Sequence, residues 1–184
     1  MPLGLGTIVL TDAVLVEKVL NGEDSFYRML VERYEKQVYS LGMSFFHNPG
    51  DSEDFTQEVF VKAFRSLGQF EGRSRFSTWL YRIAYNSAIN KAQRRTEYAG
   101  LAENAEAVFG LTPEEESVRA AVREAVREAV NDLPEKYRVC IDLFFFYDCS
   151  YYEISTITGD PVNTIKSHIF RAKKILREKL RDVR

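Results

Sequence analysis

The chain has 184 residues, of which 45% are hydrophobic, and a formal net charge of −2 at pH 7. This length fits one large domain or two small ones, and we expect two. Its longest apolar runs, such as Ile141 to Tyr147, are far too short to cross a bilayer, and the N-terminus lacks the charged flank and cleavage signal of a secretory peptide, so we expect a cytoplasmic protein without membrane insertion.

Two amphipathic helices are predicted in the first 67 residues. Apolar residues recur at steps of three or four over residues 24–47, which indicates one long helix. An Asn-Pro-Gly sequence breaks it, and Asp51 is expected to cap a second helix that runs to Leu67. Asp54 and Glu58 form a like-charge pair on this helix, which can mark an interface with a basic partner. An ordinary solvated face is equally consistent, because Lys62 has the favourable spacing from Glu58.

A third helix is predicted from a cap at Ser77 or Thr78 to about residue 95. Residues 73–95 hold six basic side chains and no acidic one, although the whole chain is slightly acidic, so we expect a polyanion contact here. An aromatic ring, a guanidinium and three carboxamides follow one another along this helix, a set that suits unstacked bases and backbone phosphates. They are Trp79, Arg82, Asn86, Asn90 and Gln93. Taken individually, Trp79 and Tyr85 fit core aromatics better than base contacts.

An acidic linker is predicted over residues 96–116, which contain six glutamates, two glycines and a proline but no basic residue. It divides the chain into an N-terminal domain, 1–95, and a C-terminal domain, 117–184. Valines at every fourth position from Val118 predict that a helix resumes there, and Pro134 suits the first turn of the next one. Almost nothing alternates with period two, so the predicted fold class is all-α, with two small helical domains.

The C-terminal domain carries a helix-turn-helix pattern. Ser150 and Glu153 have the spacing of a capping box for a short helix, and Gly159 lies in the turn that follows. Pro161 suits the first position of a longer helix with an apolar inner stripe. The opposite face mixes phosphate partners with groups that read base edges. It consists of Asn163, Lys166, Ser167, Phe170, Arg171, Lys174 and Arg177.

Phe170 is the most informative residue of this face. An aromatic ring on a basic, solvent-facing stripe exposes apolar area unless a partner covers it, and a thymine methyl group in the major groove could do so. Residues 161–184 hold eight basic and two acidic side chains, which also favours DNA. A C-terminal amphipathic helix with a solvated basic face remains the alternative.

Nothing in the sequence points to catalysis, a metal or another cofactor. Cys140 and Cys149 form no CxxC motif and lie far in sequence from His47 and His168, so we expect reduced, partly buried thiols. No nucleophile–base pair or phosphate-cradling glycine loop supports an RNA- or DNA-modifying enzyme. A stand-alone helix-turn-helix regulator stays open as an alternative. It would need an effector or dimerisation domain, and residues 12–95 would have to bind an operator or a ligand.

Four segments at linked spacing resemble the extracytoplasmic-function (ECF) sigma factors of bacterial RNA polymerase. They are DSEDFTQEVF at 51–60, FSTWLYRIAYN at 76–86, LPEKY at 133–137 and PVNTIKS at 161–167. The resemblance runs from about residue 12 to residue 181 in family order, and its linked motifs make it highly specific. It implies a promoter-recognition subunit that performs no catalysis itself. Residues 1–11 match no family motif.

The resemblance also implies partners and residue roles. The resemblance implies a surface that docks on the clamp coiled coil of the polymerase largest subunit. Its residues would be Asp54, Gln57, Glu58 and Phe60. The loop from Gln69 and the helix after it would open the minus-ten element and hold a flipped base, and the DNA contacts expected there are Arg73, Arg75, Trp79, Arg82, Asn86, Asn90 and Lys91. The minus-35 duplex would be read by Asn163, Thr164, Lys166, Ser167, Phe170, Arg171 and Lys174. The polymerase flap region and an anti-sigma factor are further expected partners.

Overall fold

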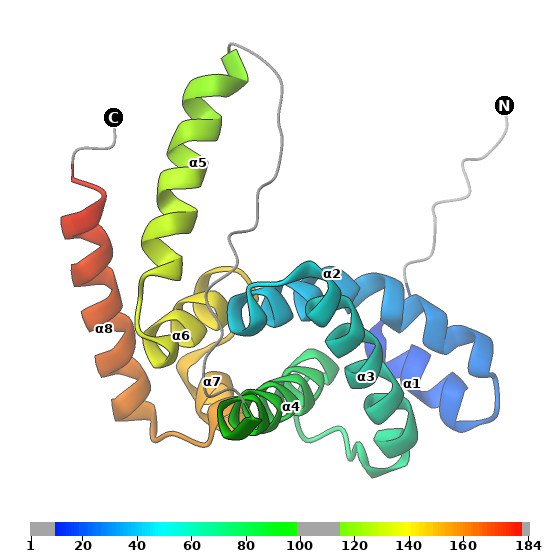
Figure 1. Cartoon of the computed structure of the whole chain (residues 1–184). Coiled ribbons are helices and arrows are strands. Elements are labelled where there is room, and N and C mark those ends of the chain that lie inside the picture. The colour runs from blue at the N-terminus through cyan, green and yellow to red at the C-terminus, as the bar shows by residue number, and fades with distance from the viewer. Residues whose placement is uncertain (1–9, 99–114, 182–184) are drawn as a thin grey trace, which may run out of the picture.

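The computed structural model describes residues 10–98 and 115–181, and in these ranges every regular element is helical (Figure 1). The all-α prediction is therefore confirmed. The predicted linker falls mostly on residues 99–114, which lie outside the described residues. The elements are α1 (Asp12–Leu20), η1 (Asp24–Phe26), α2 (Tyr27–Phe46), α3 (Pro49–Ser66), η2 (Leu67–Gln69), α4 (Phe76–Tyr98), α5 (Glu115–Asn131), α6 (Glu135–Phe145), α7 (Tyr151–Thr158) and α8 (Val162–Lys179).

Helices α1 to α4 surround one hydrophobic core. Apolar side chains from all four helices are buried in it, among them Leu15, Leu41, Phe55 and Leu80. Helices α2 and α3 approach each other closely at Gly42, where an added Cβ would lie 2.8 Å from the Phe55 ring. A side chain there would force the two helices apart.

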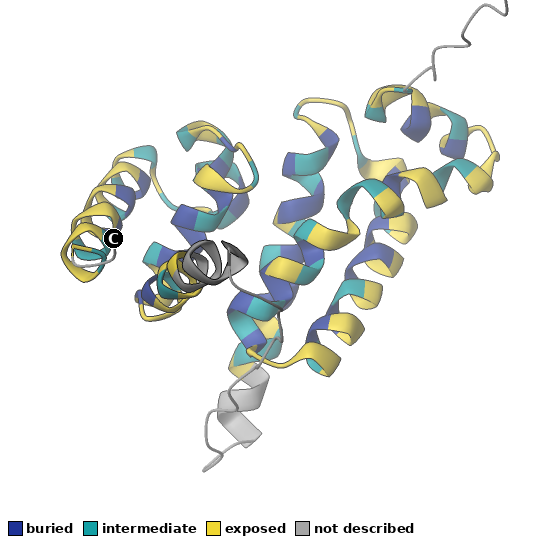
Figure 2. Cartoon of the chain, turned by 90° about the horizontal axis from the view of Figure 1, so that it is seen from above, coloured by how far each residue is buried: buried dark blue, intermediate teal, exposed yellow. Residues whose placement is uncertain are grey.

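Helices α6, α7 and α8 form the second core, with Leu143, Ile154 and Ile165 fully buried. Figure 2 shows buried positions where helices face one another and exposed positions along the outer side of the helix that leads to the C-terminus. Tyr81 of α4 is also buried in this second core. The N-terminal half thus contributes directly to the packing of the C-terminal half.

The two halves are joined by side-chain contacts as well. The Tyr147 hydroxyl donates a hydrogen bond to the backbone oxygen of Gln37 on α2, at 2.9 Å. The Tyr147 ring stacks on Tyr81, with 5.0 Å between ring centroids. Helix α7 lies along α4. This interface places the start of the helix-turn-helix beside the first turn of α4.

Two predicted caps are corrected by the structure. The N-cap of α3 lies three residues earlier than predicted, because the side chain of Asn48 accepts the backbone N–H of Asp51 and so takes the cap position. Helix α4 begins at Phe76, which leaves Ser77 and Thr78 inside the first turn. Thr78 donates its hydroxyl to Glu153 of α7 instead of capping its own helix.

Candidate nucleic-acid interface

Helix α8 is held in place by the short helix and turn that precede it. The predicted capping box is present: Ser150 and Glu153 cap α7 reciprocally. Gly159 ends α7 in the left-handed region at φ +81°, which a residue with a side chain rarely adopts. Ile165 and Ile169 then face the core. The opposite side of α8 therefore faces solvent.

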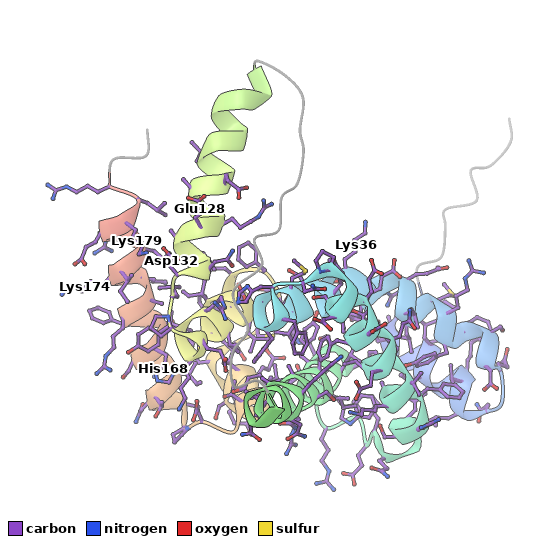
Figure 3. All side chains as sticks on the ribbon, in the orientation of Figure 1. Lys36, Glu128, Asp132, His168, Lys174 and Lys179 are labelled. Carbon is purple, nitrogen blue, oxygen red and sulfur yellow. The ribbon has the colours of Figure 1, made fainter. Side chains whose placement is uncertain are left out.

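The outer face of α8 carries the residues predicted to contact duplex DNA. Phe170 is 71% exposed, as its predicted role requires. Lys174 extends from α8 on the side away from α6 (Figure 3). The Ser167 hydroxyl donates to the backbone of Asn163, which leaves its lone pairs free to accept. Of the seven predicted residues six are exposed and Thr164 is half-buried; the exposed ones are Asn163, Lys166, Ser167, Phe170, Arg171 and Lys174.

Arg171 has a neighbour that the sequence analysis did not single out. Its Nη1 donates to the hydroxyl of Tyr137 on α6, at 3.4 Å. The Tyr137 ring lies against the His168 ring, with centroids 5.2 Å apart, and His168 Nδ1 is 3.9 Å from Cys140 Sγ. The Tyr137 hydroxyl accepts from one edge of the Arg171 guanidinium and leaves the charge of Arg171 unchanged. Most of the N–H donors of Arg171 therefore remain available to DNA.

The outer face of α4 borders an open hollow of about 210 Å³. This is below the roughly 300–1,000 Å³ of usual small-molecule pockets. Its lining combines an aromatic ring, a guanidinium and amide or hydroxyl groups, a set suited to one unstacked base. The lining residues are Ser66, Gln69, Trp79, Arg82, Ile83 and Asn86. Three predicted minus-ten residues, Trp79, Arg82 and Asn86, therefore line the same hollow. Ser66, which was not predicted, also lines it.

Trp79 combines a packing role with a place in the hollow. Its ring packs against Phe70 and Phe76, with centroid distances of 5.4 and 5.7 Å. Phe70 comes from the segment between η2 and α4, so this aromatic cluster ties that segment to the helix. Trp79 is half-buried, and it also lines the hollow.

The remaining predicted minus-ten residues differ in their surroundings. Asn90 is exposed on α4. Arg73 is exposed and pairs with Glu71 at 2.6 Å. The Lys91 ammonium lies over the Phe46 ring, 5.3 Å from its centroid. Arg75 is engaged with the C-terminal half of the molecule.

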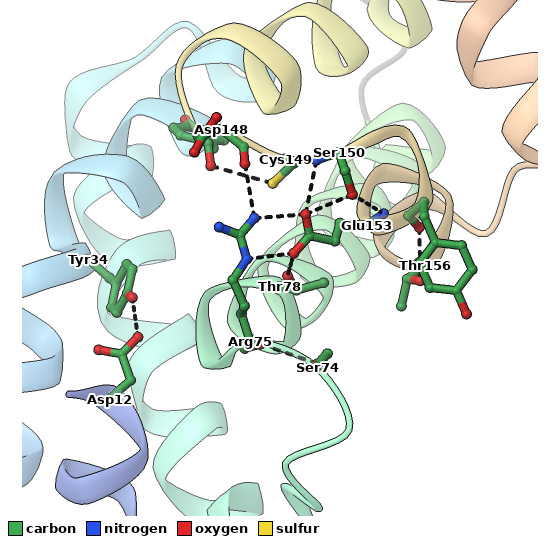
Figure 4. A network of polar contacts seen from close by, with 12 residues as sticks. Asp12, Tyr34, Ser74, Arg75, Thr78, Asp148, Cys149, Ser150, Glu153 and Thr156 are labelled. Carbon is green, nitrogen blue, oxygen red and sulfur yellow. Dashed lines mark hydrogen bonds and ion pairs between the residues drawn. The ribbon is translucent and has the colours of Figure 1, made fainter.

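Arg75 takes part in a network between α4 and α7, drawn in Figure 4. Its Nε and Nη2 donate to the two carboxylate oxygens of Glu153, at 2.6 and 2.8 Å, and Nη2 also donates to the backbone oxygen of Asp148, at 2.9 Å. Thr78 and Ser150 donate to the same carboxylate. Burial raises the pKa of Glu153, but the hydrogen bonds from Arg75, Ser150 and Thr78 outweigh it and lower that pKa to about 2.

The predicted polymerase-docking residues do not all share one surface. Asp54, Gln57 and Glu58 are exposed on α3. Glu58 accepts a hydrogen bond from Lys62, which also donates to Ser87 of α4. Phe60 points the other way and is buried in the first core. Phe60 therefore packs α3 against the core, and of the four predicted docking residues the three polar ones face outward.

The described residues hold no candidate metal site, no disulfide and no membrane-spanning helix. It contains no group of three His, Cys, Asp or Glu side chains placed to hold a metal ion. Both cysteines are free and buried, and burial raises their pKa values to about 12, so they stay protonated thiols. Among the helices described, none is both long and apolar enough to span a bilayer.

Several residues of these sites escaped sequence reasoning. Ser66 carries no motif signal. Tyr137 and Thr78 stood inside family motifs, but no local pattern connects them with Arg171 or Glu153. Glu153 was predicted only as a helix cap, since a side chain 78 residues from its partner leaves no trace in helical periodicity.

Comparison with known proteins agrees with this geometry. The family model described as Sigma-70 region 2 matches residues 30–97, and that described as Sigma-70, region 4 matches residues 123–176. The ECF RNA polymerase sigma-E factor of Escherichia coli K12 is 40% identical over 182 residues, covering 93% of this chain and 95% of its own. The RNA polymerase sigma-H factor of Pseudomonas aeruginosa is 35% identical over 176 residues, covering 90% and 91%.

Two solved structures share the fold. The sigma factor RpoE in complex with the anti-sigma factor NepR from Bartonella quintana gives a TM-score of 0.72 at 22% identity, covering 86% of this chain and 98% of that one. CnrH in complex with the cytosolic domain of CnrY gives 0.68 at 22% identity, covering 92% and 97%.

Proposed function

Because the chain belongs to the ECF family of sigma factors, we propose that its surfaces divide promoter recognition between the two halves of the molecule. As a sigma factor it binds core RNA polymerase and directs initiation at promoters. In our proposal residues 1–95 dock on the polymerase and capture and melt the minus-ten element, and residues 117–184 bind the minus-35 element as duplex.

One observation carries this division. The hollow on α4 has the size and lining for a single unstacked base, whereas the outer face of α8 is a convex basic helix with an exposed aromatic ring. An α-helix fits the major groove of an intact duplex, and a hollow beside an aromatic ring suits a strand that has already opened. The two surfaces therefore favour the two different states of promoter DNA.

The exposed acidic and amide groups of α3 support a protein contact rather than a DNA contact. Asp54, Gln57 and Glu58 would face the clamp coiled coil of the polymerase largest subunit, and the flap region would contact the C-terminal half. We also infer an anti-sigma partner, because two solved structures with this fold are complexes of that kind.

Two rival functions have less support. A stand-alone helix-turn-helix regulator would need no sigma region 2, yet that family model covers residues 30–97. An RNA- or DNA-modifying enzyme has no support from the comparisons, because both matching family models are those of sigma factors. We therefore propose that the chain performs no catalysis and that RNA synthesis stays with the polymerase.

Promoter binding with and without core enzyme tests this function. Fluorescence anisotropy on a promoter duplex should show weak binding by the isolated protein and a large gain in affinity when core polymerase is added. The affinity should also fall steeply with salt, because several phosphate contacts release counterions. Tight, sequence-specific binding that core enzyme leaves unchanged would favour the stand-alone regulator and overturn the proposal.

A further inference from the structure

The Glu153 carboxylate occupies a notch on α4 that consists of Arg75 and Thr78 (Figure 4). Arg75 presents its Nε–Nη2 edge to both carboxylate oxygens, at 2.6 and 2.8 Å. The Thr78 hydroxyl donates to Oε1 at 2.9 Å. Three donors, two from the residue that precedes α4 and one from its first turn, thus converge on one carboxylate of α7.

This arrangement of donors suits a phosphate as well as a carboxylate. The guanidinium edge binds two oxygens of either anion, and a threonine hydroxyl is a common phosphate partner. The first turn of α4 also contributes its positive end to any anion held there. Carboxylate and phosphodiester would therefore compete for the same donors.

The position of the notch points to DNA as the competing anion. Arg75 directly precedes α4, and its backbone oxygen accepts the N–H of Trp79 at 3.2 Å, so the two residues lie one turn apart at the start of the helix. Trp79 lines the hollow proposed for an unstacked base. Arg75 also keeps half of its side chain exposed, although Glu153 is only 19% exposed. A strand that leaves the hollow along the start of α4 would reach this arginine.

We propose that Arg75 and Thr78 form a phosphate-binding site for the opened promoter strand, and that Glu153 fills this site while the two halves of the protein are packed together. The inference rests on the proposed function and adds a mechanism of control to it. Thr78 is 1% exposed in the packed arrangement and becomes available only when α7 moves away. Strand binding in the notch and packing of α7 on α4 therefore exclude each other.

Glu153 can leave the notch without losing all its partners. Its Oε2 also accepts the backbone N–H and the hydroxyl of Ser150, both at 2.9 Å. These bonds lie within α7 and move with it, so the capping box survives separation of the halves. Release then breaks the contacts to Arg75 and Thr78, which a phosphate replaces, and also the packing of Tyr81 and Tyr147 between the two halves.

The test uses the full chain without polymerase and a short single-stranded DNA of randomised sequence. Glu153→Gln keeps an oxygen for the capping box but removes the charge that competes with phosphate. We expect it to tighten DNA binding by roughly threefold to tenfold. Arg75→Ala should weaken binding and lower the salt slope by about one phosphate contact.

Two controls separate the notch from general charge. Arg73→Ala also removes one cation from the same segment, but Arg73 pairs with Glu71 and not with Glu153. The gain from Glu153→Gln should persist in combination with Arg73→Ala and disappear with Arg75→Ala. It should also disappear on an oligonucleotide with a neutral methylphosphonate backbone, since that backbone offers no anion.

The outcomes distinguish this inference from the proposed function. If the wild-type protein fails to direct core polymerase to a promoter, the proposed function is wrong. If wild type does so and Glu153→Gln binds DNA no more tightly, or gains equally on the neutral backbone, the phosphate site is wrong and the Arg75–Glu153 pair serves packing alone.

Discussion

The hydroxyl of Tyr137 accepts a hydrogen bond from the Arg171 guanidinium, although the two residues lie on different helices. The contact limits the orientations of a long side chain before DNA arrives, and it leaves the charge of Arg171 intact. A positioned guanidinium loses less conformational freedom when it binds a base edge.

Tyr137→Phe should therefore relax base preference in the minus-35 element by a few fold at one position, without unfolding the protein. The ring stays in place beside His168, so packing is preserved. Selection from minus-35 variants measures the change. Arg171→Ala should relax preference at the same position, and adding Tyr137→Phe to it should change nothing more. Additive effects of the two substitutions would contradict the positioning role.

Asp54→Arg combined with Glu58→Lys should weaken binding to core polymerase and leave the fold intact, because both side chains are exposed on α3. Competition binding against the wild-type protein measures the affinity, and circular dichroism checks the fold. Phe60→Ala is the informative contrast. Since Phe60 is buried, that change should lower stability first, by about 3–5 kcal/mol. Undiminished affinity in a folded double variant would remove the docking assignment.

Asn86→Ala should spare the closed promoter complex and impair opening. Asn86 lines the hollow but makes no contact with the C-terminal half among the hydrogen bonds of the described residues. Permanganate footprinting reports unpaired thymines in the minus-ten element, so it measures opening directly. Asn90→Ala gives the comparison: Asn90 is exposed on the same helix but outside the hollow, so its loss should impair opening less than the loss of Asn86. Normal opening by the Asn86 variant would return Asn86 to an ordinary surface role.

Asp142 should make stability depend on pH near neutrality. Burial raises its pKa to about 7, although Arg138 and a hydrogen bond with Ser44 lower it in part. Burial and the charge of Asp142 in turn raise the pKa of Tyr147. Because the folded pKa lies above the unfolded value, its contribution is full below about pH 4 and is lost as pH rises through 7.

Asp142→Asn removes this titration. Its stability relative to wild type should rise between pH 5 and 8, by on the order of 2 kcal/mol at the higher pH, as urea unfolding would measure. Ser44→Ala should shift the change to higher pH, since Ser44 favours the charged carboxylate. A constant difference between Asp142→Asn and wild type across this range would show that Asp142 is ionised in the folded protein.

Much of the fold follows from local sequence signals. The apolar repeat predicted α2, and the Ser150–Glu153 spacing predicted the start of α7, since both signals act within one or two turns of helix. The same rules missed α1, although Thr11 supplies a cap and Leu15, Val16 and Val19 supply an inner face. Helix α1 has only nine residues, so its apolar repeat is too short to be recognised by periodicity.

The candidate sites were less predictable, because they depend on contacts between distant segments. The outer face of α8 could be deduced from one helix alone. Phe60 could not be assigned, since family position suggested docking and only the packing of α3 shows it to be inward. The pairing of Arg75 with Glu153 depends on how the two halves meet, which neither helix encodes by itself.

Trp79 is the only tryptophan in the chain, and it lines the hollow on α4 while its other side packs on Phe70 and Phe76. Excitation selective for tryptophan therefore reports from this one location. A base that stacks on the ring would quench its emission, whereas binding confined to α8 would leave it unchanged. The protein thus contains an intrinsic optical probe of strand capture, which allows stopped-flow measurement of promoter opening without an attached dye.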